Sequence, residues 1–108
     1  SEMSWFTDNA PEPAIAYWQD AYPTMGTEAE NIARASRAGF SVLSTQRLPS
    51  QAWWANYYDP LRERMQTIEI TPSTQAVIRE IEEEMQLFEQ FSNFYGYTFY
   101  SLQPTSDL

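Results

Sequence analysis

Residues 94–100 read Phe-Tyr-Gly-Tyr-Thr-Phe-Tyr and stand between a long helical pattern and the end of the chain. Gly96 ends the helical pattern, because glycine commonly terminates a helix. Residues 97–102 then carry apolar or aromatic side chains at both alternating sets of positions. Burial on both faces is typical of a strand inside a sheet. The sequence therefore predicts a central last strand, followed by a polar tail over residues 103–108.

The helical pattern that precedes this strand covers residues 73–93. Thr71-Pro72 is its start signal, since proline is favoured in the first turn of a helix. Four glutamates near its middle predict a solvated face, and no metal site is expected because successive helical positions point apart. The apolar stripe consists of Val77, Ile78, Ile81, Met85, Phe88 and Phe91.

A second aromatic block, Ala-Trp-Trp-Ala-Asn-Tyr-Tyr-Asp-Pro-Leu, covers residues 52–61. Ser50 is expected to cap its helix, and Asp59 to leave the helical region because a proline follows it. A fresh helix is expected from Pro60, with Leu61, Met65 and Ile68 inward. Four aromatic residues on two sides of this block either pack in a core or an interface, or line a substrate pocket: Trp53, Trp54, Tyr57 and Tyr58.

The first forty-eight residues predict strand, helix, helix, strand. The strands cover residues 2–6 and 40–48. Asp8 or Asn9 is expected to cap the first helix, on which Ile15, Trp18 and Tyr22 share a face. Thr27 and Glu30 form a capping box that opens the second helix, and Gly39 suits its left-handed end.

Composition excludes several classes of function. The chain has no cysteine and no histidine, so thiolate, disulfide and Ser-His chemistry are absent from it. Fifteen acidic residues against six arginines give a net charge of −9, which disfavours nucleic acid and anionic membranes as partners. No apolar run reaches the roughly 20 residues that a membrane span needs, and no secretory signal is recognised, so a cytoplasmic protein is expected.

The whole chain resembles the C-terminal part of class I S-adenosylmethionine-dependent methyltransferases of the small-molecule branch. The resemblance rests on residues 94–100, on the Ala-Gly-Phe turn at residues 38–40, and on Leu48-Pro49 followed by the aromatic block and Pro60-Leu61. Residues 2–6 resemble that family's fifth strand, residues 41–48 its sixth and residues 97–102 its seventh.

The resemblance implies an incomplete α/β domain over residues 1–102. It implies a three-stranded mixed sheet in the order 5-7-6, with the last strand antiparallel, and four to five helices, of which residues 50–95 form a helical insertion. The family's glycine-rich loop has no counterpart, since the three glycines are Gly26, Gly39 and Gly96. The resemblance implies S-adenosylmethionine as the cofactor of the parent enzyme. Because the loop is missing, no cofactor is expected to bind this chain alone.

The function implied is the acceptor side of a methyltransferase that acts on a small molecule, with the cofactor-binding half as a missing partner. The isolated chain is expected to be inactive, and no catalytic residue is assigned. Ligands bind beyond the carboxyl ends of strands in such sheets, which makes Trp5 and Asp8 substrate-binding candidates. Asp8 either orients or deprotonates an acceptor or caps a helix. Arg62 either pairs with neighbouring acids or recognises an anionic acceptor.

A second interpretation is a non-enzymatic interaction module. A detached half of such a sheet exposes a strand edge, and exposed edges invite pairing between chains. In this interpretation a homodimer covers the edge together with the aromatic helix.

Overall fold

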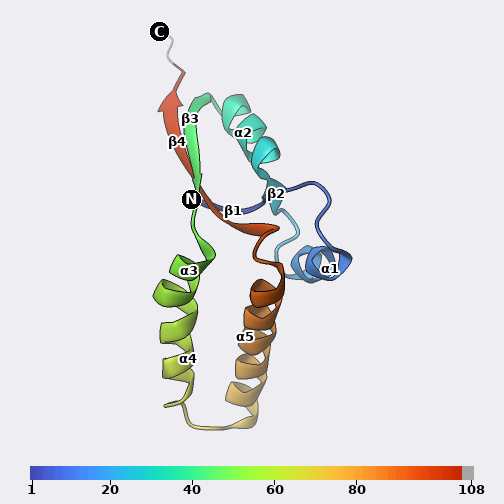
Figure 1. Cartoon of the computed structure of the whole chain (residues 1–108), viewed down its shortest axis with the longest axis vertical. Helices are drawn as coiled ribbons and strands as arrows, with labels where there is room; N and C mark the ends of the chain where they lie inside the picture. The colour runs from blue at the N-terminus through green and yellow to red at the C-terminus, as the bar shows by residue number, and fades with distance from the viewer. Residues whose placement is uncertain (106–108) are drawn as a thin grey trace. The chain divides into compact units, whose positions relative to one another are not determined.

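The computed structural model describes residues 1–105 and contains two compact units. Unit 1 comprises Ser1–Leu48 and Asn93–Leu108, and unit 2 comprises Pro49–Ser92. Unit 1 holds the sheet and two helices, whereas unit 2 is entirely helical. Figure 1 labels these elements along the chain.

The sheet of unit 1 is mixed and has the strand order β2-β1-β4-β3. Its strands are β1 (Glu2–Trp5), β2 (Gly26–Thr27), β3 (Phe40–Arg47) and β4 (Tyr95–Pro104). The last strand, β4, is antiparallel to both of its neighbours, β1 and β3. The α/β class and the mixed sheet are therefore as predicted from the sequence.

The predicted number of three strands is wrong, because β2 pairs with β1 in parallel through two residues, Gly26 beside Ser4 and Thr27 beside Trp5. A strand of two residues is too short to show the alternation by which strands are recognised. β4 is also longer than predicted, since Gln103 pairs with Ser41 and Pro104 with Phe40. The rest of the predicted tail, residues 106–108, lies outside the described residues.

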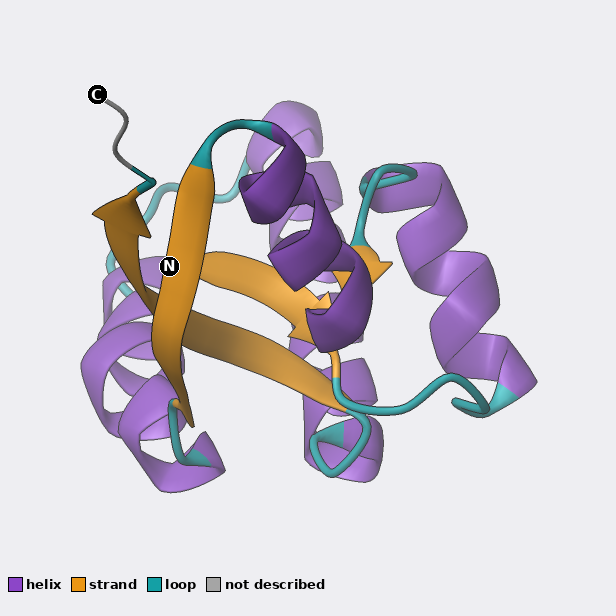
Figure 2. Cartoon of the chain, turned by 90° about the horizontal axis from the view of Figure 1, so that it is seen from above, coloured by secondary structure: helices purple, strands orange, loops and turns teal. Residues whose placement is uncertain are grey.

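The two faces of β4 differ in burial, which the sequence did not predict. Thr98 is fully buried on the face that α2 (Glu28–Arg37) covers, and Figure 2 shows this helix lying across the strands. On the opposite face Tyr95 is buried against Trp18 of α1 (Glu12–Ala21), but Phe99 is 45% exposed. The last strand is central, as predicted, but burial on both faces holds only near its start, at Tyr95 and Thr98. Aromatic side chains tolerate partial exposure, and the alternation does not reveal which neighbours cover them.

The ends of the two helices of unit 1 follow the sequence only in part. α2 begins with the predicted capping box, and Gly39 after its end has φ 94°, the left-handed conformation expected there. α1 begins instead after Pro11, without a side-chain cap. Asn9 bonds with Thr7 rather than with the helix, so the predicted cap by Asp8 or Asn9 is wrong.

Unit 2 is a pair of helical rods. The first is continuous and consists of α3 (Ser50–Trp53), a π-helical turn (Trp54–Tyr58) and α4 (Asp59–Met65). The second is α5 (Pro72–Phe91), with Thr71 as its cap, close to the predicted boundaries. None of the helices within residues 1–105 is long and apolar enough to span a bilayer.

Two predicted features of the first rod are wrong. Asp59 stays helical (φ −64°, ψ −47°), and its N–H bonds to the carbonyl of Trp54 five residues earlier. This wider turn opens the helix just before Pro60, which has no N–H to donate, so the chain accommodates proline without breaking. Ser50 is the first residue of α3 rather than its cap, which is Pro49.

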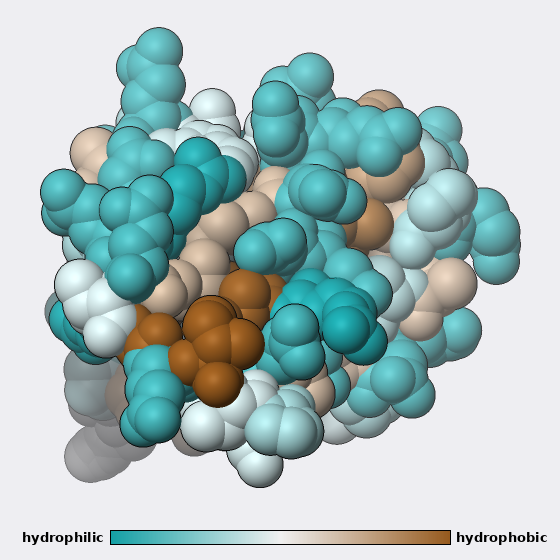
Figure 3. All heavy atoms as spheres, turned by 90° about the horizontal axis from the view of Figure 1, so that it is seen from below, coloured by the Kyte–Doolittle hydropathy of each residue, from teal (hydrophilic) through white to brown (hydrophobic). Residues whose placement is uncertain are grey.

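Only part of the apolar pattern of unit 2 is buried. Met65, Met85 and Phe88 are buried, but Ile68 follows the end of α4 and is exposed, and Val77 is 54% exposed. Figure 3 shows one larger group of apolar residues, in brown, among hydrophilic ones on the face that it presents. The exposed large apolar side chains of unit 2 include Ile68, Ile70 and Val77.

Candidate functional site

A hollow of about 440 Å³ lies at the carboxyl end of β1 and is termed here the β1 hollow. Its position agrees with the general placement of ligands at the ends of strands in α/β sheets. The structure thus brings together two of the six predicted substrate-binding residues. The hollow is lined by Trp5, Thr7, Asp8, Ala10, Ile15, Thr27 and Glu30.

Trp5 forms an aromatic wall of the hollow, and contacts with other aromatic rings hold it in place. Its ring meets that of Tyr95 edge to face, with centroids 5.7 Å apart, and Tyr95 meets Trp18 in the same manner at 5.5 Å. Edge-to-face aromatic pairs of this kind contribute about 0.5–1.5 kcal/mol beyond the area that they bury. The indole ring is therefore held by a chain of edge-to-face contacts with Tyr95 and Trp18, while part of it stays accessible.

Asp8 follows β1 and is exposed at the rim of the hollow. It does not cap α1, and its carboxylate has no hydrogen bond or ion pair within residues 1–105. The helix-cap interpretation of Asp8 is thus excluded, and its carboxylate is available to a ligand. From the sequence, Asp8 could either act on an acceptor or cap a helix.

The start of α2 supplies a second carboxylate to the hollow. Glu30 accepts the backbone N–H of Thr27 at 2.8 Å, and Thr27 Oγ1 accepts the backbone N–H of Glu30 at 3.1 Å. The hydrogen bond from the backbone N–H of Thr27, followed by the effect of the Thr27 side chain, lowers the pKa of Glu30, so this carboxyl group is an anion at neutral pH. The hollow therefore has acidic groups on two sides, and no arginine lines it.

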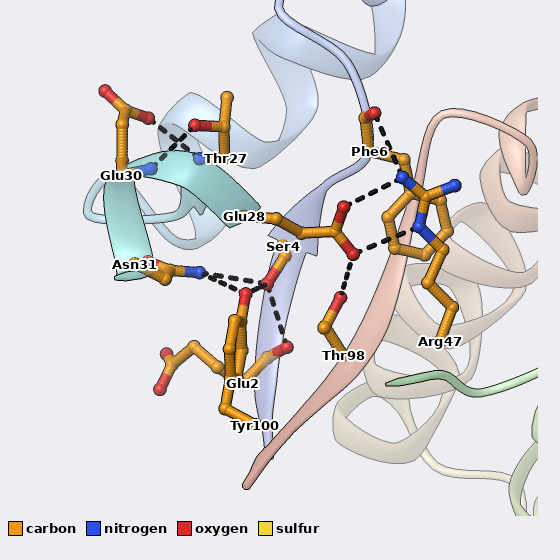
Figure 4. Close-up of polar contacts among 10 residues, drawn as sticks. All are labelled: Glu2, Ser4, Phe6, Thr27, Glu28, Glu30, Asn31, Arg47, Thr98 and Tyr100. Carbon is orange, nitrogen blue, oxygen red and sulfur yellow. Dashed lines mark hydrogen bonds and ion pairs between the residues drawn. The ribbon is translucent and has the colours of Figure 1, made fainter. Parts of the chain in front are cut away.

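Beside the hollow, Arg47 closes a polar link across the sheet that the sequence did not reveal (Figure 4). Arg47 donates to both oxygens of Glu28, at 2.8 and 3.0 Å, and Glu28 also accepts the hydroxyl of Thr98 at 2.7 Å. The guanidinium lies 4.2 Å from the centre of the Phe6 ring. The hydrogen bonds from Arg47 lower the pKa of Glu28, against an opposing effect of burial, and those to Glu28 raise the pKa of Arg47.

A buried polar cluster lies under α2 and was also missed. The amide nitrogen of Asn31 donates to Ser4 Oγ at 2.9 Å and to the Tyr100 hydroxyl at 3.0 Å, and these two oxygens are 2.7 Å apart. A Cβ on Gly26 would stand 3.2 Å from Asn31 Oδ1, so glycine fits this position closely. Thr98 and Tyr100 are alternate residues of β4, and Ser4 lies on the neighbouring strand β1. Their hydroxyl groups within largely apolar strands were the one sequence signal for a polar cluster on this face of the sheet.

Two of the four predicted site residues of unit 2, Trp53 and Tyr58, are buried in its core, whereas Trp54 and Tyr57 are not. Trp53 (2% exposed) and Tyr58 (0%) pack with Phe88, and the Trp53 and Phe88 rings have centroids 4.3 Å apart. Tyr58 donates its hydroxyl to Glu84 at 2.6 Å. Trp54 is half-buried against Tyr58, whereas Tyr57 is 50% exposed. Of the two interpretations, core packing therefore holds for Trp53 and Tyr58.

Within residues 1–105 Arg62 makes no ion pair, although pairing with neighbouring acids was one of its two predicted roles. Its guanidinium lies 5.4 Å from the centre of the Trp54 ring and 3.6 Å from the sulfur of Met85. It lines a separate hollow of about 460 Å³ along α4 and α5. Among residues 1–105 there is no group of three or more acidic side chains that could hold a metal ion.

No family model matches the chain, and no curated protein matches it either.

Proposed function

We propose that this chain is the acceptor-side, C-terminal portion of an S-adenosylmethionine-dependent methyltransferase that acts on a small molecule. The observation that carries the proposal is the order of three strands. β4 lies between β1 and β3 and is antiparallel to both, and this relation supports the 5-7-6 order that we propose from the resemblance. An antiparallel last strand between two parallel ones is an uncommon topology, because consecutive elements usually lie side by side.

The location of the β1 hollow supports the same proposal. In the implied fold the acceptor lies beyond the carboxyl end of the fifth strand, which corresponds to β1, and Trp5 and Asp8 line a hollow there. Bound S-adenosylmethionine would supply a methyl group on a positively charged sulfur, and the acceptor would take that group while the carbon–sulfur bond breaks. The residues of this chain would align the acceptor and exclude water from it.

The proposal assigns cofactor binding to another part of the enzyme. Gly26 precedes α2, Gly39 follows it and Gly96 lies in β4, so the described residues contain no glycine pair in a strand-to-helix loop. Cofactor contacts of the family's usual kind would then come from a separate portion. The proposal retains the expected cytoplasmic location, which fractionation of the host cell would test.

Two measurements test the proposal. Calorimetry with S-adenosylmethionine should give no heat of binding with the chain alone, and should give binding once the coding sequence upstream is included. That upstream sequence should encode a strand followed by a Gly-x-Gly turn. Micromolar affinity of the chain alone for S-adenosylmethionine would contradict the assignment of cofactor binding to another portion.

A dimerising interaction module is the second candidate, and the edge of the sheet favours it. β3 is eight residues long, pairs with β4 and lies at the end of the strand order, so its other edge has no strand beside it within the described residues. Leu43 in this strand is 63% exposed, and the register shifts between Val42 and Ser44. Light scattering should detect a dimer, and Leu43→Lys should abolish it; a monomer at all concentrations would exclude this candidate.

A further inference from the structure

We propose that the β1 hollow binds the cationic group of a small organic molecule, such as an alkylammonium. The inference deepens the proposed function and rests on it only for the role of the bound molecule as methyl acceptor. The binding itself follows from the residues that line the hollow. It needs neither the cofactor nor any other part of the proposed enzyme.

The first argument is electrostatic. Asp8 and Glu30 both line the hollow, whereas no arginine does, and the chain contains no lysine. Arg47, at the carboxyl end of β3, is already bound by both oxygens of Glu28. The charged groups that line the hollow are therefore both anions, which favours cations over carboxylates and phosphates as ligands.

The second argument concerns the helix end at the hollow. The N-terminus of a helix ordinarily attracts anions through its free N–H groups. Here the N–H of Thr27 is bound by the carboxylate of Glu30, and the N–H of Glu30 is bound by Thr27 Oγ1. The helix end thus carries its own anion, and the ligand preference of the hollow is set by the carboxylates.

The third argument is the chemistry of the wall. Trp5 contributes an indole ring, the aromatic group that attracts cations most strongly, and its edge-to-face contact with Tyr95 holds it in place. Asp8 has no partner among the described residues and can approach the ligand as a counter-ion. An aromatic ring with a carboxylate is a chemistry that recognises ammonium groups. A hollow of about 440 Å³ has room for a small molecule.

The test is a titration of the ¹⁵N-labelled full chain with choline, followed by NMR. The matched probe is 3,3-dimethylbutan-1-ol, which has the same shape without the charge. Choline should bind with a dissociation constant of about 1–10 mM and shift the signals of Trp5, Thr7, Asp8 and Thr27. The neutral probe should bind about tenfold more weakly, since the cation–π and ion-pair contributions are lost together.

Two variants and one control locate the binding. Asp8→Asn should weaken choline binding about threefold, and Trp5→Leu should weaken it by a similar factor. The control, Asp20→Asn, removes an exposed carboxylate that does not line the hollow and should leave affinity unchanged. Asp8 is exposed, so its variant stays informative even where Trp5→Leu fails to fold. Raising the salt concentration should weaken binding of choline and leave the neutral probe unaffected.

Equal affinity for the two probes, or shifts confined to unit 2, would overturn the inference. Equal effects of Asp8→Asn and Asp20→Asn would overturn it as well. Its failure is distinct from failure of the proposed function, because the titration contains no methyl donor. Choline binding by a chain whose complete protein transfers no methyl group would support the inference and refute the proposed function.

Discussion

Glu28 and Arg47 tie the first residue of α2 to the last residue of β3 through two parallel hydrogen bonds of 2.8 and 3.0 Å. Between them lies β4, whose Thr98 donates its hydroxyl to the same carboxylate. Two-point contacts between arginine and a carboxylate fix geometry as well as charge. The pair thus aligns the helix with an edge strand next to the β1 hollow.

A double-mutant cycle with Glu28→Gln and Arg47→Gln measures the coupling energy between these two residues. The side chain of Arg47 is 52% exposed, so solvent screens the pair and the coupling energy should be about 0.5–1 kcal/mol. Urea denaturation of the four proteins measures it. Additive effects of the two substitutions would show that the contact contributes nothing to stability.

The same carboxylate makes stability depend on pH. Its pKa is lower in the folded protein than the ordinary value of 4.5, chiefly because Arg47 donates hydrogen bonds to it. Its stabilising contribution is then complete above the pKa of the unfolded chain and is lost as the pH falls through the lower folded pKa. The difference in unfolding free energy between the wild type and Glu28→Gln should shrink below about pH 4.5. A constant difference down to pH 3 would contradict this assignment.

The capping box of α2 predicts a loss of stability on Thr27→Ala. The substitution removes the oxygen that accepts the N–H of Glu30 and should cost about 1 kcal/mol of unfolding free energy. Thr27→Ser keeps that oxygen and should stay within about 0.5 kcal/mol of the wild type. Chemical denaturation distinguishes the two variants, and equal destabilisation by both would refute the role of the hydroxyl.

Substitutions of Gly39 should lower the unfolding free energy by an amount that depends on the new residue. With φ at 94°, it adopts a conformation that residues with a Cβ rarely take. Gly39→Ala should lower the unfolding free energy by about 1 kcal/mol, and Gly39→Asn by less, because asparagine tolerates left-handed backbone better. Thermal unfolding of both variants checks the order.

Substitutions of buried aromatic residues in the core of unit 2 should lower the unfolding free energy strongly. Phe88→Ala should cost about 3–5 kcal/mol, because Phe88 is 1% exposed and contacts Trp53 and Tyr58. Tyr58→Phe removes the hydrogen bond to Glu84 and should cost about 1–2 kcal/mol. Val77→Ala, at a position 54% exposed, is the control and should change stability by less than about 0.5 kcal/mol. A cost for Val77→Ala equal to that for Phe88→Ala would contradict this description of the core.

The sequence was sufficient for features that depend on neighbours along the chain. The capping box of Thr27 with Glu30, the left-handed Gly39 and the start of α5 at Thr71-Pro72 all follow from local hydrogen bonding and backbone sterics. Local rules failed at Asp59, where a wider helical turn before Pro60 keeps the chain helical. A proline predicts a break only when the preceding turn has no other way to satisfy its backbone.

For the candidate site, the alternation of strands and helices was enough to place Trp5 and Asp8 at the end of β1, because such sheets bind ligands there. Only the tertiary structure paired Glu28 with Arg47 and buried Asn31 beside Ser4 and Tyr100. These partners are 19 to 69 residues apart in sequence. Local patterns fix which elements form, whereas contacts between polar side chains depend on how those elements pack, and a single sequence does not show which side chains meet.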